Sequence, residues 1–377
     1  MSYLTSGLHN HLIRLTPSAI LYPAVFVLAL SATVSAQQFI TIDAPGAGSG
    51  RYQGTEAIDI SPEGAILGYY VDTGYRSHGF LRAPDGTFTT IDAPGAGTNP
   101  AEGTIPCSRN QTGSITGYYT DTNYNRHGFL KTPDGAFTAI DAPGAGIAAN
   151  QGTIPFNINP EGAIAGYYAD ASGAYHGFLR TPDGAITTVD APGAGTGAFQ
   201  GTWIQAGDLD SKGTIAGNYI DDDSVAHGFV RSPNGAFTTF EVLGAKAIAN
   251  EGTFVSGLNA SGTTVGSYFD GTSAIHGYIR TPGGDIVTFD VAGAGVGPRQ
   301  GTRAEAINSL GTITGTYVGT DSVYHGFVRA RNGVITKFDP PGAAGLGTIP
   351  TEIDSAGTIV GLYYDANGAT HVFVRTR

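Results

Sequence analysis

Seven histidines recur along this chain, and each is followed by glycine or valine and then by an aromatic residue. Imidazole is the commonest metal-binding side chain, so the set could form a metal centre. They are His78, His127, His176, His227, His276, His325 and His371, and the steps between them are 49, 49, 51, 49, 49 and 46 residues. Equivalent positions in repeated units lie far apart, so these histidines cannot converge on one ion. We therefore expect a structural role for them, with no metal and no cofactor.

The elements that position the histidines are short strands. The unit from Gly54 to Glu102 holds four stretches rich in Ile, Phe, Thr, Tyr and Val, each bounded by Gly, Pro, Asp or Asn. This pattern is typical of four β-strands, here named A to D. Tight turns, such as Pro-Asp-Gly at 84–86, would join A to B and C to D. The longer B–C and D–A loops would then lie together at the other end of the strands.

The two ends of the chain indicate how the units are arranged. The segment Phe39–Asp43 resembles a lone strand D, and the segment His371–Arg375 resembles a strand C with no strand D after it. A ring makes use of that offset, because the first strand can complete the last unit. The sequence therefore predicts an all-β fold, a seven-bladed β-propeller with four strands per blade, closed by the N-terminal strand. A β-solenoid is the alternative.

The strand pattern also predicts what surrounds each histidine. Counting residues from the Pro-Asp-Gly turn places His78 opposite Asp92 on strand D and opposite Tyr70 on strand B. We expect a hydrogen-bonded Tyr–His–Asp network in every blade, since a carboxylate fixes the imidazole tautomer. The same positions recur as Tyr119, His127 and Asp141, and as Tyr168, His176 and Asp190. Asp43 would serve His371 through ring closure, and Glu241 takes the place of the aspartate beside His227.

Composition and the first residues set the expected location. Residues 1–36 combine one charge, a short apolar run and small residues near Ala36, which is typical of a secretory signal peptide. We expect residues 37–377 to form a single propeller domain, secreted or periplasmic, with no membrane insertion after cleavage. The net charge of −12 and the lack of a basic cluster argue against nucleic-acid partners. We expect a monomer.

The repeated motif resembles a known family. His-Gly-Phe at 78–80 follows a Gly-x-Tyr-x-Asp segment and precedes a Thr-x-Ile-Asp-x-Pro-Gly-Ala segment. This unit is similar to the bacterial extracellular repeat named for a His-Ala-Phe motif, the HAF repeat, over Phe39–Arg375. The middle residue here is glycine, or valine at position 372. The resemblance implies an exported repeat protein with a propeller fold, and it brings no established activity or catalytic residue.

Function in a repeat protein is expected where the repeats differ, on the loops of one face. The innermost strand A varies most at its first position, and the D–A loops vary beside it. Exposed aromatic rings next to polar groups suit sugars or peptides. We predict a binding or scaffold module for a glycan or protein ligand on the long-loop face. The candidate ligand-binding residues are Arg51, Tyr52, Glu56, Phe199, Trp203, Phe254, Arg303 and Glu305.

The alternative function is a propeller enzyme of the glycosidase, lyase or lactonase type, with its site at the mouth of the central channel. Glu56 and Glu305 could then act as an acid–base pair. The sequence offers no nucleophile, base and orienting group in one set, so no catalytic residue is assigned and we favour the binding role. The enzyme hypothesis requires Glu56, Trp203, Arg303 and Glu305 to share one depression.

Overall fold

The computed structural model describes residues 38–205 and 209–376 of the 377-residue chain. The predicted signal peptide, residues 1–36, lies outside them. All regular elements of the described residues are β-strands, and among those residues no helix could cross a membrane. Contacts join the described residues into one compact unit. The expectation of an all-β fold is confirmed.

Each repeat folds as four consecutive antiparallel strands. Strands A to D of the first group are β2 (Gly54–Ile60), β3 (Ile66–Val71), β4 (Ser77–Arg82) and β5 (Phe88–Ile91), and each pairs with the next. The following groups are β6 (Gly103–Arg109), β7 (Ile115–Thr120), β8 (Arg126–Lys131) and β9 (Phe137–Ile140); then β10 (Gly152–Ile158), β11 (Ile164–Ala169), β12 (Tyr175–Arg180) and β13 (Ile186–Val189); then β14 (Gly201–Trp203), β15 (Ile215–Ile220), β16 (Ala226–Arg231) and β17 (Phe237–Phe240).

The second half of the chain continues the pattern. Its groups are β18 (Thr253–Leu258), β19 (Thr264–Phe269), β20 (Ile275–Arg280) and β21 (Ile286–Phe289), followed by β22 (Gly301–Ile307), β23 (Ile313–Val318), β24 (Tyr324–Arg329) and β25 (Ile335–Phe338). The last three strands are β26 (Thr348–Ile353), β27 (Ile359–Tyr364) and β28 (Thr370–Thr376). β28 is the last strand among the described residues, and it takes the place of a strand C, as the sequence predicts.

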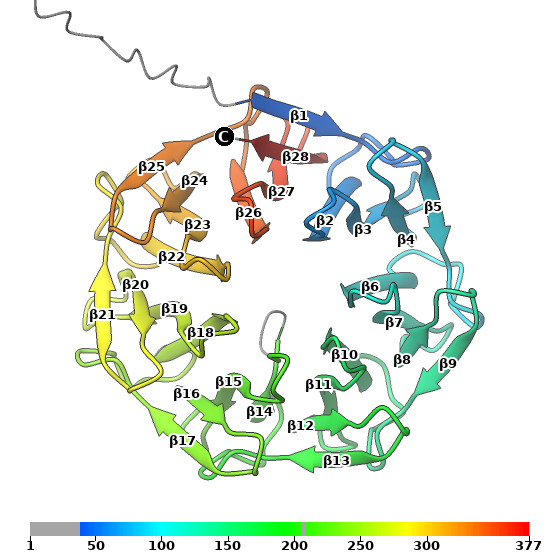
Figure 1. The fold of residues 1–377 in the computed structure, drawn as a ribbon, viewed down its shortest axis with the longest axis horizontal. Helices are drawn as coiled ribbons and strands as arrows, with labels where there is room; N and C mark the ends of the chain where they lie inside the picture. The colour runs from blue at the N-terminus through cyan, green and yellow to red at the C-terminus, as the bar shows by residue number, and fades with distance from the viewer. Residues whose placement is uncertain (1–37, 206–208, 377) are drawn as a thin grey trace, which may run out of the picture. The chain divides into compact units, whose positions relative to one another are not determined.

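The first strand, β1 (Gln38–Ile42), supplies the missing neighbour. It pairs antiparallel with β28, with Ile42 opposite Val372 and Gln38 opposite Thr376. Figure 1 shows β1 beside β28 at the rim, while β2, β6 and the other A strands lie nearest the centre. The expected pairing of the N-terminal strand with the C-terminal strand is confirmed.

Neighbouring groups meet at a repeated Gly-Thr pair that opens strand A. Gly54 forms a parallel bridge with Thr370, at a φ of 122°. A Cβ on Gly54 would lie 2.0 Å from the Thr370 carbonyl oxygen, so only glycine fits there. The next residue, Thr55, is fully buried, and its hydroxyl accepts a hydrogen bond from the Ala44 N–H at 2.9 Å. This contact joins the D–A loop, strand A and the preceding group at one point.

The hydrophobic core lies between adjacent groups. One cluster combines Ala165 and Val189 of the third group with Ile204, Ile215 and Phe229 of the fourth. Phe229, from the His-Gly-Phe motif, has no exposed surface. A second cluster joins Ile42 to Val372, Val374 and Phe80. Because each group buries its apolar face against the next, the packing of one group depends on its neighbours.

The pairing of β1 with β28 predicts a stability difference between two isoleucines of one strand. Ile42 is 7% exposed and packs in the core, whereas Ile40 is 53% exposed. Ile42→Ala should lower the free energy of unfolding by about 2 kcal/mol or more, because it leaves a cavity beside Val372. Ile40→Ala, the matched control, should change it by less than about 0.5 kcal/mol. Urea denaturation measures both, and equal losses would mean that β1 is not packed as described.

Candidate functional site

Six of the seven repeat histidines contact the carboxylate 14 residues further on, as the strand register predicts, and His371 contacts Asp43. The Nδ1 atom of His78 lies 3.1 Å from each carboxylate oxygen of Asp92, and that of His176 lies 2.9 Å from Asp190. The remaining pairs are His127–Asp141, His227–Glu241, His276–Asp290, His325–Asp339 and His371–Asp43. The last pair joins residues from opposite ends of the sequence, at 2.8 Å.

The tyrosine opposite each histidine stacks on the imidazole ring and does not hydrogen-bond to it as expected. Tyr70 stacks on the His78 ring, with centroids 4.9 Å apart and planes inclined by 17°, so the predicted Tyr–His hydrogen bond is wrong. Tyr119 and His127 stack in the same way, as do Tyr168 and His176. The ring lies flat on the imidazole because both stand on the same face of paired strands at directly opposite positions. The Tyr168 hydroxyl instead lies 3.3 Å from the Thr188 hydroxyl on strand D.

A second carboxylate on each histidine was missed by the sequence reasoning. The Nε2 atom of His78 lies 3.4 Å from Asp72 of the B–C loop. The other six histidines have such a partner at 3.0 to 3.8 Å: Asp121, Asp170, Asp221, Asp270, Asp321 and Asp365. Six of these seven aspartates stand six residues before their histidine, a spacing that could have revealed them. Each imidazole therefore lies between two carboxylates, one on each nitrogen.

At His227, His276 and His325 this arrangement raises the imidazole pKa and so favours the protonated ring. Burial lowers the pKa of His276, but hydrogen bonds and charge attraction from Asp290 and Asp270 outweigh it, so the pKa is raised above 6.5. Burial raises the pKa of Asp270, but hydrogen bonds from Thr272, Ala274 and the histidine outweigh it, so that pKa is lowered. The two carboxylates bind opposite ring nitrogens and do not converge. Among the described residues no cluster of His, Cys, Asp or Glu could hold a metal ion.

The raised histidine pKa predicts how stability varies with pH. A histidine with a raised folded-state pKa stabilises fully below its unfolded value of about 6.5, and this is lost as pH rises through the folded value. The free energy of unfolding should therefore fall as the pH rises above about 6.5, and His276→Gln should make that fall shallower. Val287→Thr, on an exposed residue of the same group, is the control. Urea titrations at several pH values that give equal slopes for His276→Gln and wild type would contradict this.

Two predicted ligand-binding residues, Trp203 and Phe199, are brought together by two tyrosines that the sequence reasoning missed. The Tyr175 ring lies 5.8 Å from Trp203 and 6.2 Å from Phe199, centroid to centroid. Tyr167 contacts Tyr175 at 5.2 Å and Trp203 at 5.8 Å. Phe199 is 74% exposed, Trp203 and Tyr175 are half-buried, and Tyr167 is buried. The result is a continuous aromatic cluster running from strand A outward to the D–A loop.

Arg51 and Tyr52 lie at a separate hollow on the same face. The Arg51 guanidinium stacks on the Tyr52 ring at 4.7 Å. Both line a cavity of about 340 Å³ with Leu346, Tyr364 and residues of the last B–C loop. Leu346 stands in the D–A connection that is three residues shorter than the others. The shortened loop leaves this hollow beside Tyr52.

The remaining predicted residues at the start of strand A have local partners. Glu56 accepts a hydrogen bond from the Tyr69 hydroxyl at 2.5 Å, and burial, partly offset by that bond, raises its pKa. Phe254 contacts Phe269 edge to face at 5.9 Å. The Arg303 Nε is buried without a hydrogen-bond partner among the described residues. These side chains are spread around the centre and do not form one cluster with Trp203.

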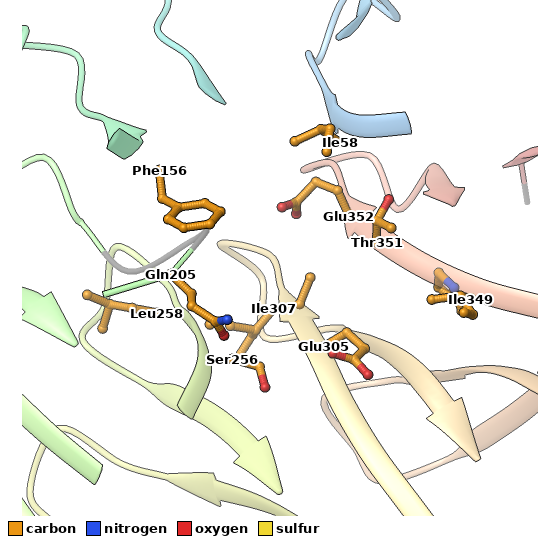
Figure 2. A pocket seen from close by; sticks show the side chains of 13 residues that line it. Ile58, Phe156, Gln205, Ser256, Leu258, Glu305, Ile307, Ile349, Thr351 and Glu352 are labelled. Carbon is orange, nitrogen blue, oxygen red and sulfur yellow. The ribbon is translucent and has the colours of Figure 1, made fainter. Parts of the chain in front are cut away.

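Glu305 lines a different cavity, deeper along strand A. The strand bulges there, because Ala304 and Ala306 pair with successive residues of β23 and Glu305 is passed over. The cavity holds about 400 Å³ and is also lined by Phe156, Gln205 and Glu352. Figure 2 shows Phe156 and Glu352 approaching it from opposite sides. Glu56, Trp203 and Arg303 do not line this cavity, so the depression that the enzyme hypothesis requires is not formed by those four residues.

Glu352 lines this cavity, and a second carboxylate, Asp59, lies close to it. Burial, with the Asp59 charge as the next cause, raises the pKa of Glu352 to about 8. Burial also raises the pKa of Asp59, although the Arg109 charge from the neighbouring group opposes it. The positive charge of Arg109 thus stabilises the ionised form of Asp59. This contact accounts for an arginine at a position where other repeats have an apolar residue. A protonated Glu352 at neutral pH could donate a proton to a bound molecule.

Comparison with solved structures defines the class of fold. The chain resembles virginiamycin B lyase from Staphylococcus aureus, with a TM-score of 0.60 and 14% identity over 91% of this chain and 100% of the other. An oligogalacturonate lyase from Vibrio parahaemolyticus gives a TM-score of 0.52 at 10% identity, covering 90% and 96%. A puromycin hydrolase gives 0.52 at 13% identity, covering 88% and 55%. At these identities the likeness shows the β-propeller fold alone.

Neither a search against protein-family models nor a search of curated proteins finds a match.

Proposed function

We propose that the chain is an exported, seven-bladed β-propeller of the HAF-repeat type that binds a glycan on its long-loop face. Seven four-stranded groups, with β1 completing the last, support the blade count and the closure. The leader-like composition of residues 1–36 supports export to the periplasm or the medium. The repeats differ on the long-loop face, which is where a ligand is expected.

The single observation that carries the binding function is the aromatic cluster of Trp203, Tyr175, Tyr167 and Phe199. A sugar ring presents an apolar face that stacks on an aromatic ring and hydroxyls that need polar partners. Phe199 and Trp203 offer such faces, while Tyr175 adds a hydroxyl. The cluster sits on strands and on a loop anchored by backbone hydrogen bonds, including Phe199 N–H to Gly173 at 2.9 Å. The platform is therefore fixed before a ligand arrives, which lowers the entropic cost of binding.

Charge narrows the class of ligand. The chain carries a net charge of −12, and the B–C loops each place an aspartate at the long-loop face. Phosphate backbones and strongly anionic polysaccharides would be repelled. A neutral glycan, bound by a monomeric protein, fits best. A protein ligand is the other outcome that a binding screen can reveal.

A glycan-array screen with a matched pair of variants tests this function. Trp203→Ala should reduce the affinity for the bound glycan at least about tenfold, because it removes the centre of the aromatic cluster. Leu310→Ala, a 58% exposed apolar residue in the A–B turn at the opposite end, should leave affinity unchanged. Trp203 is the only tryptophan, so quenching of its fluorescence by the same glycan reports binding in solution. If Trp203→Ala binds the array glycan as strongly as wild type does, the glycan site is not at this aromatic cluster.

The Glu352 cavity favours a second candidate function, a polysaccharide-cleaving enzyme with a general acid at the centre of the propeller. A carboxyl group with a pKa of about 8 is protonated at neutral pH and can donate its proton to the leaving group of a cleaved bond. Release of oligosaccharide ends from the bound polysaccharide should then decline as pH rises through about 8, and Glu352→Gln should abolish it. Reducing-end assays on wild type and this variant check the point. Release that persists in Glu352→Gln excludes this cavity as the source.

A further inference from the structure

Adjacent groups also touch on the long-loop face, at pairs of loop residues that share an unusual backbone conformation. One member of each pair lies in a D–A loop, directly before a Gln-Gly or Glu-Gly sequence. Its N–H donates a hydrogen bond to the carbonyl oxygen of a B–C loop residue in the adjacent group, three positions before the histidine of that group. Tyr52 bonds to Gly368 at 3.0 Å in this way, and Phe199 to Gly173 at 2.9 Å. Both members of every such pair have a positive φ. We call each pair a junction.

Aromatic residues occupy four consecutive junctions. Tyr52, Tyr75, Tyr124 and Phe199 have φ values between 60° and 65°. Each is the one aromatic member of its pair: Gly368/Tyr52, Tyr75/Ala101, Tyr124/Asn150 and Gly173/Phe199. The next two junctions, Ser224/Asn250 and Ser273/Arg299, have none. The four aromatic junctions therefore form one uninterrupted arc on the long-loop face.

Folding does not explain these four aromatic residues. A bulky side chain in the left-handed region is strained, and glycine or serine stands at the positions equivalent to Tyr75 and Tyr124 in the other repeats. The positions equivalent to Tyr52 and Phe199 include alanine, asparagine and, at position 299, arginine. Burial does not repay the strain, since the four rings are 60%, 46%, 42% and 74% exposed in chain order. Strain that persists without a packing gain points to a functional use of the residue.

We propose that the four junction aromatics are successive subsites for one neutral polysaccharide chain that runs along the arc. This deepens the proposed function, on which it rests, by naming a polymer as the ligand. The junction partner of each ring is a small or polar residue, so the four rings are separate from one another, which suits stacking on separate sugar rings and does not suit one apolar partner surface. At the Phe199 end the arc meets Tyr175 and Trp203, and at the Tyr52 end it meets the hollow lined by Arg51 and Leu346.

Several weak subsites on a rigid scaffold act together on a long ligand. A chain that occupies one junction meets the next at high effective concentration, so affinity should grow with chain length. A short oligosaccharide that reaches a single junction gains nothing from the others. This length dependence separates an extended arc from one isolated sugar site at Trp203.

The first test uses stability alone. Tyr75→Gly and Tyr124→Gly place at these junctions the residue that the chain itself has at Gly173 and Gly368. Because glycine removes the strain, each variant should melt at the wild-type temperature or a few degrees above it. Ser273→Gly, at a junction without an aromatic residue, is the matched control. A melting temperature several degrees below wild type for both tyrosine variants would mean that the rings serve the fold, and would overturn the proposal.

The second test measures binding to defined polymers by affinity gel electrophoresis with laminarin, xylan, galactomannan and dextran, and with polygalacturonate as the anionic comparison. At least one neutral polymer should retard the protein, and polygalacturonate should not. Tyr75→Gly and Tyr124→Gly should each weaken binding about three- to tenfold, and the double variant more than either. Ser273→Gly should bind as wild type does. The hexasaccharide of the same polymer, measured by Trp203 fluorescence, should bind all these variants equally.

The outcomes separate the two proposals. If Trp203→Ala loses binding while the tyrosine variants keep it for polymer and hexasaccharide alike, the glycan function stands and the arc is wrong. If no neutral polymer binds, or polygalacturonate alone binds, both are wrong. If polymer binding falls in Tyr75→Gly and Tyr124→Gly at an unchanged melting temperature, the arc is supported.

Discussion

The close approach of one group to the next at the Gly-Thr pair is the constraint on which the whole structure depends. At Gly201, as at Gly54, a Cβ would lie within 2.0 Å of the neighbouring carbonyl oxygen. The bare backbone lets strand A of one group bridge strand C of the previous group, Gly201 to Tyr175. The threonine that follows holds the D–A loop by its buried hydroxyl, with Ala191 as the donor at 2.8 Å. Spacing between groups is therefore set by backbone contact.

Such a constraint leaves little of the strands free to vary. Residues that pack between groups, such as Phe229 and Ile215, are fully buried, and changing them would leave cavities. Variation is tolerated where side chains leave the core, at the first position of strand A, at the bulge and on the long loops. The structure accordingly concentrates its differences among repeats at the centre and on one face. The proposed binding face and the central cavity both lie where the repeats differ, outside the packed strands.

The sequence was sufficient to predict the strands, the pairing of β1 with β28 and the histidine–carboxylate pairs. It was sufficient because turn residues fix the register of short antiparallel strands. The pairing of His371 with Asp43 is the clearest case. The stacking of Tyr70 was not predictable from register, which gives the facing position but not the ring orientation. Tyr175 and Tyr167 were missed because they meet Trp203 across two groups. The contact of Asp59 with Glu352 was missed for the same reason, since a contact between repeats has no signature in the spacing within one repeat.

The histidine network and the candidate site are connected through the B–C loop. One oxygen of Asp72 accepts hydrogen bonds from Gly74 N–H at 2.7 Å and Arg76 N–H at 3.0 Å, on either side of Tyr75. The other oxygen faces the His78 ring at 3.4 Å. The carboxylate that contacts the His78 imidazole therefore also holds the loop in the turn that gives Tyr75 its positive φ. A network that stabilises each group thus pre-organises an aromatic ring on the long-loop face, so the repeated element supplies rigidity and the variable residue within it supplies the chemistry.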